Sequence, residues 1–251
     1  AIGLLAAGWR ELRDPLRARH PEVWHAPPLW RMLELGAPIG VQYFLEYGIF
    51  GLVALLMGLI GTTEMAGHQV ALNLAALTFN VPLGVSTAAA VLLGQAVGRG
   101  DAGAARQAAM IAYGLGVGFM VLSAITMLAI PETLARIYTD DTGVLAMAAA
   151  LIPLAGLFQV FDGMQVVGSG VLRGLGDTRA PMVVSLLGFW LLGLPTSVYL
   201  GFGTPLGPRG LWWGLVVGLA AVAVFLAVRV KRRLNHTLRR VVIDVTPSAI
   251  G

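Results

Sequence analysis

Six long apolar segments constrain this chain more than any other feature of its sequence. A helix that crosses a bilayer needs about 20 mostly apolar residues. Six stretches meet that requirement, at residues 34–60, 68–97, 103–130, 143–170, 180–202 and 210–230. Only 12% of the residues are charged, whereas a soluble domain carries about 25%. We therefore predict an all-α membrane protein with one six-helix transmembrane bundle over residues 34–230.

The basic residues predict how the chain crosses the membrane. Cytoplasmic loops of membrane proteins are enriched in Lys and Arg. With six spans, fifteen of the seventeen basic residues fall on one side, and only Arg136 and Arg209 fall on the other. We expect both ends to be cytoplasmic, with residues 1–33 as the end of a preceding helix and a linker, and residues 231–251 as a basic tail. This pattern indicates membrane topology and contact with anionic lipid rather than nucleic-acid binding.

Two carboxylates interrupt the apolar segments. Eleven of the thirteen acidic residues fall in loops, at helix ends or in the tail, but Glu46 and Asp162 lie inside predicted spans. Each is ~10 residues from the cytoplasmic end of its helix, and therefore ~15 Å deep, near the middle of the bilayer. No Lys or Arg is expected at that depth. We predict that the pair binds a coupling cation, Na⁺ or H⁺; the alternative is a protonated carboxyl that hydrogen-bonds to a neighbouring helix.

Several polar residues accompany these carboxylates. Gln42 precedes Glu46 by four residues, and Gln159 and Gln165 lie three residues before and after Asp162, so each can share a helix face with its carboxylate. Asn73 lies on the second span, which His68 opens at its outer end. We expect these amides to support the cation site, and we expect His68 to lie at the membrane interface.

Small-residue spacings predict where helices approach one another closely. The pairs are Gly36/Gly40, Gly94/Gly98, Gly114/Gly118 and Gly214/Gly218. Prolines inside the predicted spans, at Pro82, Pro153 and Pro195, predict kinks because each removes a backbone hydrogen bond.

No segment indicates an enzyme. GRGDAG, residues 98–103, matches a dinucleotide fingerprint but falls in a turn between spans, without the βαβ unit that such a site needs. GLGD, residues 174–177, contains an Asp of the kind found in intramembrane aspartyl proteases, whose two carboxyls share a proton at ~3 Å. Asp177 and Asp162 are expected to differ in depth by ~15–20 Å. The chain has no cysteine. We expect neither catalysis nor a cofactor beyond the coupling ion.

Five segments together resemble the multidrug and toxic compound extrusion (MATE) transporters, most closely the NorM-type branch. They are FLEYGIFGLVALL, HQVALN, GQAVGRGD, FQVFDGMQVVGSGVLRGLGDT and LGLP. The resemblance covers residues ~30–230 and implies a twelve-helix fold of two lobes around a central cleft. This chain resembles the second lobe, helices seven to twelve. An N-terminal six-helix lobe would then be its missing partner.

The resemblance also implies a function and a site. Family members are secondary active transporters that exchange Na⁺ or H⁺ for cationic, often aromatic drugs, here across a bacterial inner membrane. The resemblance implies that Glu46 and Asp162 form the cation site of the second lobe. NorM-type proteins can have a Tyr where this chain has Phe158, so a hydroxyl is lost while an aromatic face that favours a cation remains. Two alternatives stay open: a lipid or polyisoprenoid flippase of the same superfamily, and a passive half that assembles with another polypeptide.

Overall fold

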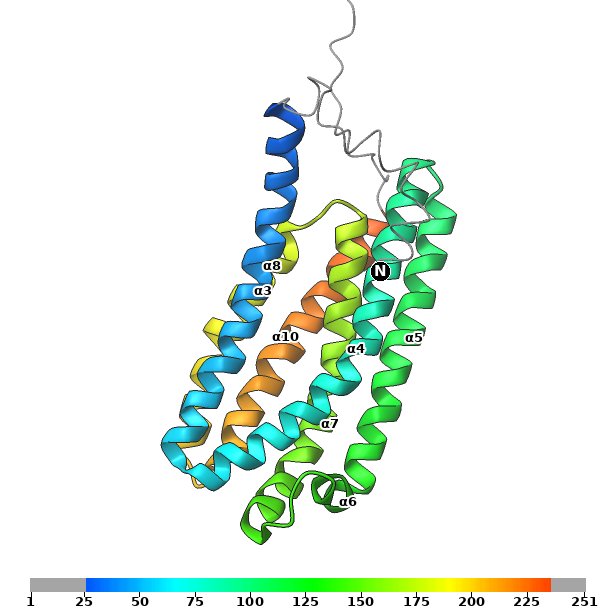
Figure 1. Ribbon diagram of the computed structural model, residues 1–251. Coiled ribbons are helices and arrows are strands. Elements are labelled where there is room, and N and C mark those ends of the chain that lie inside the picture. Colours follow the sequence, from blue (N-terminus) through cyan, green and yellow to red (C-terminus); the bar gives the residue numbers. More distant parts are fainter. Residues whose placement is uncertain (1–25, 236–251) are drawn as a thin grey trace, which may run out of the picture. The chain divides into compact units, whose positions relative to one another are not determined.

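The computed structural model describes residues 26–235, which are helical apart from short turns (Figure 1). The described residues divide into two units, residues 26–37 and residues 38–235. In the smaller unit, the described part is the first turns of a helix, in which Arg31 and Glu34 form an ion pair at 2.7 Å. The packing below concerns residues 38–235. The predicted linker and basic tail lie largely outside the described residues.

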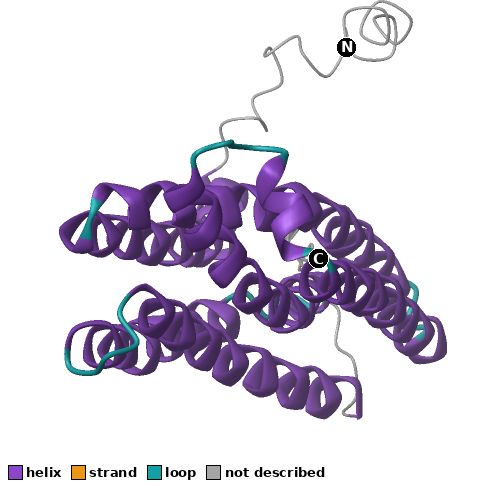
Figure 2. Ribbon diagram, turned by 90° about the horizontal axis from the view of Figure 1, so that it is seen from below, coloured by secondary structure: helices purple, strands orange, loops and turns teal. Residues whose placement is uncertain are grey.

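Nine helical segments make up the described chain. They are α3 (Ala26–Ile60), α4 (Thr62–Gly98), α5 (Ala102–Ala129), α6 (Pro131–Arg136), α7 (Thr142–Gly174), α8 (Arg179–Ser185), the π-helix η2 (Leu186–Gly193), α9 (Leu194–Phe202) and α10 (Pro208–Asn235). No strand occurs among residues 26–235, and short loops join the helices (Figure 2).

Together these segments form six stretches that are long and apolar enough to cross a membrane, which confirms the six-span, all-α prediction. They are Leu29–Ile60, Thr62–Gly98, Ala102–Ala129, Thr142–Gly174, Arg179–Phe202 and Pro208–Asn235. The fifth span combines α8, η2 and α9. The helices extend past the predicted limits: α3 begins at Ala26 and α10 continues to Asn235. Hydropathy detects only the apolar part of a helix. The polar last turns of α10 are also helical, so the helix is longer than the predicted span.

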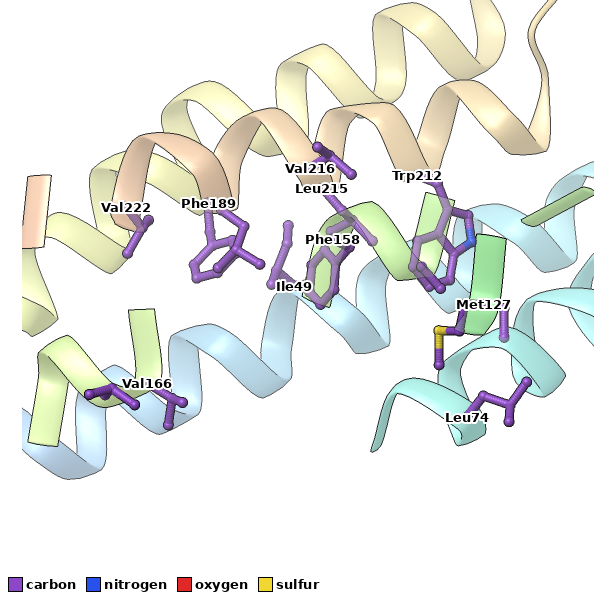
Figure 3. Close-up of a cluster of buried hydrophobic side chains, with 14 of the residues drawn as sticks. Ile49, Leu74, Met127, Phe158, Val166, Phe189, Trp212, Leu215, Val216 and Val222 are labelled. Carbon is purple, nitrogen blue, oxygen red and sulfur yellow. The ribbon is translucent and has the colours of Figure 1, made fainter. Parts of the chain in front are cut away.

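Helix α7 lies at the centre of the packing, against α4, α5 and α10. Its buried face continues into an apolar core with Trp212 and Leu215 of α10 and Ile49 of α3 (Figure 3). The ring of Phe158 packs edge-on against Phe50 at 5.8 Å and against Trp212 at 6.0 Å. Aromatic pairs prefer this geometry because the positive ring edge meets a negative face. Phe158 therefore connects α3, α7 and α10.

Helices α3 and α7 run antiparallel, and their contacts follow one another in order. Arg173 contacts Tyr43, Gln165 contacts Glu46, and Phe158 contacts Phe50. As the residue number rises on α3, it falls on α7. This register places the middle of one span beside the middle of the other.

The two glycine-aspartate turns share one geometry. After α7, Gly176 has φ 74°, and the Asp177 N–H donates to the Leu172 carbonyl at 2.8 Å. After α4, Gly100 has φ 72°, and the Asp101 N–H donates to the Ala96 carbonyl at 2.9 Å. A left-handed glycine followed by such a bond is a Schellman helix ending. GRGD and GLGD are thus helix stops, which agrees with the rejection of nucleotide-binding and protease roles for them.

Among the predicted glycine pairs, Gly214 and Gly218 pack most tightly. A Cβ on Gly214 would collide with the backbone of Ser197, and a Cβ on Gly218 would lie 2.8 Å from the Gly193 Cα atom. In contrast, a Cβ on Gly114 or Gly118 would meet no described atom within 4 Å. The prediction of close packing is therefore right for the α10 pair and wrong for the α5 pair, because spacing alone does not say which face of a helix meets a neighbour.

The prolines occupy two kinds of position in their helices. Pro82 and Pro153 lie inside α4 and α7, as predicted, and Pro38 lies inside α3. Pro195 instead lies in the first turn of α9, directly after the π-helical segment, where the Leu194 N–H donates to the Phe189 carbonyl. A π-helical turn widens the hydrogen-bond ladder locally. Ser185 ends α8 directly before this segment, and Phe189 lies within it.

Candidate cation site

Glu46 and Asp162 line the same cavity, of about 390 Å³, in residues 38–235. Glu46 comes from α3 and Asp162 from α7, so the antiparallel register of these helices brings them to one place. Most of the cavity wall is apolar. Its aromatic residues are Tyr43, Tyr47, Phe50, Phe79, Phe158 and Phe189.

Three side chains donate hydrogen bonds to a single oxygen of Glu46. Its Oε1 atom accepts from Gln42 Nε2 at 2.8 Å, from Gln165 Nε2 at 2.6 Å and from Ser185 Oγ at 3.0 Å. Donors of this kind stabilise negative charge on a carboxylate. Among the described residues, the Oε2 atom receives no hydrogen bond, so it is the oxygen left for a proton or a cation.

Asp162 has a different environment. No described residue donates a hydrogen bond to its carboxylate, and it lines the same cavity as Glu46, so two ionised carboxylates there would repel each other. Glu46 thus accepts three hydrogen bonds, whereas Asp162 accepts none from the described residues. A bound cation would relieve the repulsion, since it attracts both groups.

The cavity offers oxygen ligands of the kind that suits a hard cation. In residues 26–235, no group of three or more His, Cys, Asp or Glu could hold a metal ion. A transition-metal centre is therefore not indicated in this part of the chain. Hard cations prefer oxygen ligands such as carboxylates. Two carboxylates in one cavity therefore suit a single hard cation such as Na⁺, or a proton bound to one of them.

Three of the predicted supporting residues reach the site. Gln42 and Gln165 are buried and bind Glu46 directly. Phe158 lines the cavity with its ring.

Two predicted supporting residues do not reach it. Asn73 is exposed, and its Nδ2 atom donates to the Gln69 carbonyl of its own helix. Gln159 is fully buried, but its Nε2 atom points to the sulfur of Met127 on α5 at 3.2 Å. Each residue turns a helix by about 100°, so Gln159 faces a different neighbour from Phe158. The expected roles of Asn73 and Gln159 are therefore corrected: neither contacts the carboxylates.

Four residues of the site with polar groups were not predicted from the sequence. Ser185, Asn80, Tyr43 and Tyr47 either bind Glu46 or line the cavity. Asn80 lies two helical turns beyond Asn73 on the same face of α4. This seven-residue spacing could have indicated Asn80 as a second candidate on that face. Ser185 carried no signal, because serine is common at helix–helix contacts.

Arg173 lies closer to the site than its position at the end of a span indicated. Its guanidinium lies 4.9 Å from the centre of the Tyr43 ring, and its NH1 atom donates to the Tyr43 hydroxyl at 2.8 Å. Its NH2 atom donates to Gln42 Oε1 at 3.4 Å. No Lys or Arg was expected at the depth of the carboxylates to pair with them; Arg173 forms no ion pair with Glu46 among the described residues but contacts its neighbours Tyr43 and Gln42. A long arginine side chain can extend several ångströms along its helix.

His68 is fully buried within the protein, and its ring packs edge-on against Trp212 at 5.6 Å. Neither ring nitrogen has a hydrogen-bond partner among the described residues. The ring fills a gap in the core beside Trp212.

Asp177 is buried outside the cavity. Its Oδ2 atom accepts from Arg229 at 2.8 Å and from Arg233 at 3.0 Å, so it connects the α7–α8 turn to α10. Burial disfavours its charge, but hydrogen bonds and positive charge from both arginines outweigh that effect and hold the pKa of Asp177 below its ordinary value. Its role is structural, consistent with the distance from Asp162 expected from the sequence.

Comparison with known proteins identifies the family. A family model described as MatE matches residues 38–199. The multidrug resistance protein NorM of Burkholderia vietnamiensis is 42% identical over 234 residues, which cover 91% of this chain and 50% of the relative. A probable multidrug resistance protein NorM of Xanthomonas axonopodis pv. citri (strain 306) is 42% identical over 224 residues, which cover 88% of this chain and 48% of the relative. The chain therefore spans about half the length of the curated relatives it matches.

Solved structures agree with the sequence comparison. The eukaryotic MATE transporter AtDTX14 superposes with a TM-score of 0.75 at 25% identity, over 81% of this chain and 47% of that structure. A MATE structure in the bent conformation gives a TM-score of 0.78 at 17% identity, over 87% of this chain and 48% of that structure, and supports the fold alone. These names describe transporters and resistance proteins rather than enzymes. With six membrane spans, a two-carboxylate cavity and a family match over most of its length, this multi-pass membrane chain belongs to the MatE family.

Proposed function

We propose that this chain forms the second lobe of a secondary active multidrug transporter, which exports cationic and aromatic drugs in exchange for Na⁺ or H⁺. Glu46 and Asp162 bind the coupling ion. The names of its relatives support multidrug export. A first lobe of six further helices completes the transporter in a bacterial inner membrane, with both ends of this lobe on the cytoplasmic side.

One observation supports the ion site above the others. Two carboxylates from separate helices face one cavity, and the Oε2 atom of Glu46 and both oxygens of Asp162 accept no hydrogen bond from the described residues. Ionisable groups inside a membrane protein are usually functional because their burial is costly. An ion that bridges the pair removes that cost, whereas two structural carboxyls would be expected to find donors of their own.

Ion binding can be coupled to drug release through the helices that carry the carboxylates. The ion neutralises negative charge in the cavity and draws α3 and α7 together through Glu46 and Asp162. The population of lobe conformations then changes by as much as the ion affinity differs between them, and by no more. A cationic drug in the cleft is released outward as the ion enters, since both are attracted by the same negative charge.

The experiment is dye efflux from proteoliposomes that contain the complete transporter. A Na⁺ gradient at equal pH and a pH gradient without Na⁺ are imposed in turn, and efflux under one of them identifies the coupling ion. Glu46→Gln and Asp162→Asn are each expected to reduce ion-driven efflux at least tenfold. Glu132→Gln, an exposed glutamate on α6, is the matched control and should leave efflux unchanged.

The opposite result would reject this function. If folded protein exported no dye under either gradient and instead moved fluorescent lipid between leaflets, the chain would be part of a flippase. If efflux persisted at full rate in both variants, the coupling ion would bind elsewhere.

A further inference from the structure

Gln42 has a fixed amide orientation. Its Nε2 atom donates to Glu46 Oε1 at 2.8 Å and to Ser169 Oγ at 3.2 Å, while its Oε1 atom accepts from Arg173 at 3.4 Å. Both hydrogens and the oxygen are therefore used. The reversed amide would turn its oxygen toward the Glu46 carboxylate and its NH₂ group toward the guanidinium. Both new contacts would be repulsive, so Arg173 decides which end of the amide meets Glu46.

Arg173 is itself held in place by Tyr43. The guanidinium lies 4.9 Å from the centre of the Tyr43 ring and donates to the Tyr43 hydroxyl at 2.8 Å. Its Nε atom is buried without a described hydrogen-bond partner. An arginine at a helix end can usually extend its head into water. Here the side chain leaves one donor unsatisfied, so the contacts with Tyr43 and Gln42 must offset that cost.

We propose that Arg173 is a positioning residue of the ion site: through Gln42 it fixes the donor on Glu46 Oε1 and thereby reserves Oε2 for the coupling ion. The inference rests on the proposed function of Glu46. Arg173 does not touch the ion. Its effect passes along Arg173, Gln42 and Glu46, from the end of α7 to the middle of α3.

The geometry predicts the direction of the effect. With Arg173 in place, Gln42 presents a donor to Glu46 Oε1, and Oε2 stays open. Without Arg173, Gln42 can reverse and turn its oxygen toward the carboxylate, so Glu46 loses a fixed donor and its side chain can rotate. The coupling ion then meets a less ordered carboxylate and is bound less tightly.

The test is the dependence of the initial dye-efflux rate on the concentration of the coupling ion that drives it, measured with the complete transporter in proteoliposomes. Arg173→Ala is expected to raise the half-saturating ion concentration about tenfold, the effect of losing a hydrogen bond to a charged group. Gln42→Ala should raise it similarly, and shifts are compared as logarithms of this concentration. Arg232→Ala, an exposed arginine of α10, is the control and should leave it unchanged.

The double variant Gln42→Ala/Arg173→Ala separates a relay from a direct effect of charge. A shift no larger than that of Gln42→Ala alone supports the proposal, because residues that act through one another are not additive. A shift equal to the sum of the two overturns it. Arg173→Lys keeps the charge but cannot stack on Tyr43 and bind in a fork as arginine does. Full recovery by lysine would therefore also overturn positioning through Gln42.

Folding and function are controlled separately. The thermal unfolding midpoint in detergent is measured for each variant, and Tyr43→Phe, which removes only the hydroxyl anchor, replaces Arg173→Ala if that variant does not fold. If Glu46→Gln leaves efflux and its dependence on the coupling ion unchanged, the proposed ion site is wrong. If Glu46→Gln abolishes ion-driven efflux while Arg173→Ala leaves the half-saturating ion concentration in place, only the role of Arg173 is wrong.

Discussion

The Nε2 atom of Gln165 lies 2.6 Å from the Oε1 atom of Glu46, although 119 residues separate them along the chain. This contact joins α7 to α3 at the carboxylate itself. It makes Gln165 part of the proposed ion site, whereas Gln159, three residues before Asp162 on the same helix, points toward α5.

Gln165→Leu is expected to reduce ion-driven efflux about tenfold, since a hydrogen bond to a charged group contributes about 1.5–3 kcal/mol. Glu46 would lose a donor and the fixed orientation of its free oxygen. Gln159→Leu is the matched control: it removes a side chain whose oxygen is buried without a described partner, so efflux should stay within about twofold of the parent. Equal losses in both variants, measured as initial rates in proteoliposomes, would contradict the assignment.

The two asparagines of α4 provide a second comparison. Asn80 lines the cavity, whereas Asn73 lies about 10 Å further along the same helix and bonds to its own backbone. We expect Asn80→Ala to lower the apparent affinity for the coupling ion about threefold to tenfold, the effect of losing one polar group. Asn73→Ala should leave it unchanged. Titration of efflux against ion concentration measures both, and a larger effect at Asn73 would mean that the site lies nearer the outer end of α4.

Asp177→Asn is expected to destabilise the lobe by about 1–3 kcal/mol, because it weakens the buried attachment of the α7–α8 turn to Arg229 and Arg233. The pKa of Asp177 is lowered in the folded state. Its stabilisation is therefore present at neutral pH and is lost as the pH falls through the lowered folded value, below about 3.8. Thermal unfolding in detergent between pH 3 and pH 7 checks this.

Asp101→Asn is the control for Asp177→Asn. Asp101 caps α5 through the Ala104 N–H at 2.9 Å but is exposed and has no arginine partner in residues 26–235. Its loss should cost at most about 1 kcal/mol. If both variants unfolded at the same temperature, the arginine contacts of Asp177 would contribute nothing.

Gly214→Ala is expected to destabilise the lobe by about 1–3 kcal/mol, since the new methyl would collide with the Ser197 backbone and push α9 away from α10. Gly114→Ala, which meets no described atom within 4 Å, should be neutral or stabilise α5 by up to about 1 kcal/mol. Unfolding midpoints of the two variants in the same detergent provide the comparison. A neutral Gly214→Ala would mean that α9 and α10 can separate at little cost.

The sequence by itself determined the number of spans and the two carboxylates that interrupt them. Both follow from the cost of placing polar groups in hydrocarbon, which a residue carries wherever its neighbours lie. For the same reason Glu46 and Asp162 could be selected before any contact was known. The glycine-aspartate turns were equally local, because a left-handed residue ends a helix by its own backbone geometry.

Only the tertiary structure decided which side chains meet these carboxylates. The rotation of α7 about its axis turned Gln165 toward Glu46 and Gln159 toward Met127. The packing of the fifth span brought Ser185 within hydrogen-bond distance of Glu46, and the length of the Arg173 side chain let it contact Gln42. These choices depend on how helices rotate and slide against one another. Close packing sets that arrangement, and no short stretch of sequence encodes it.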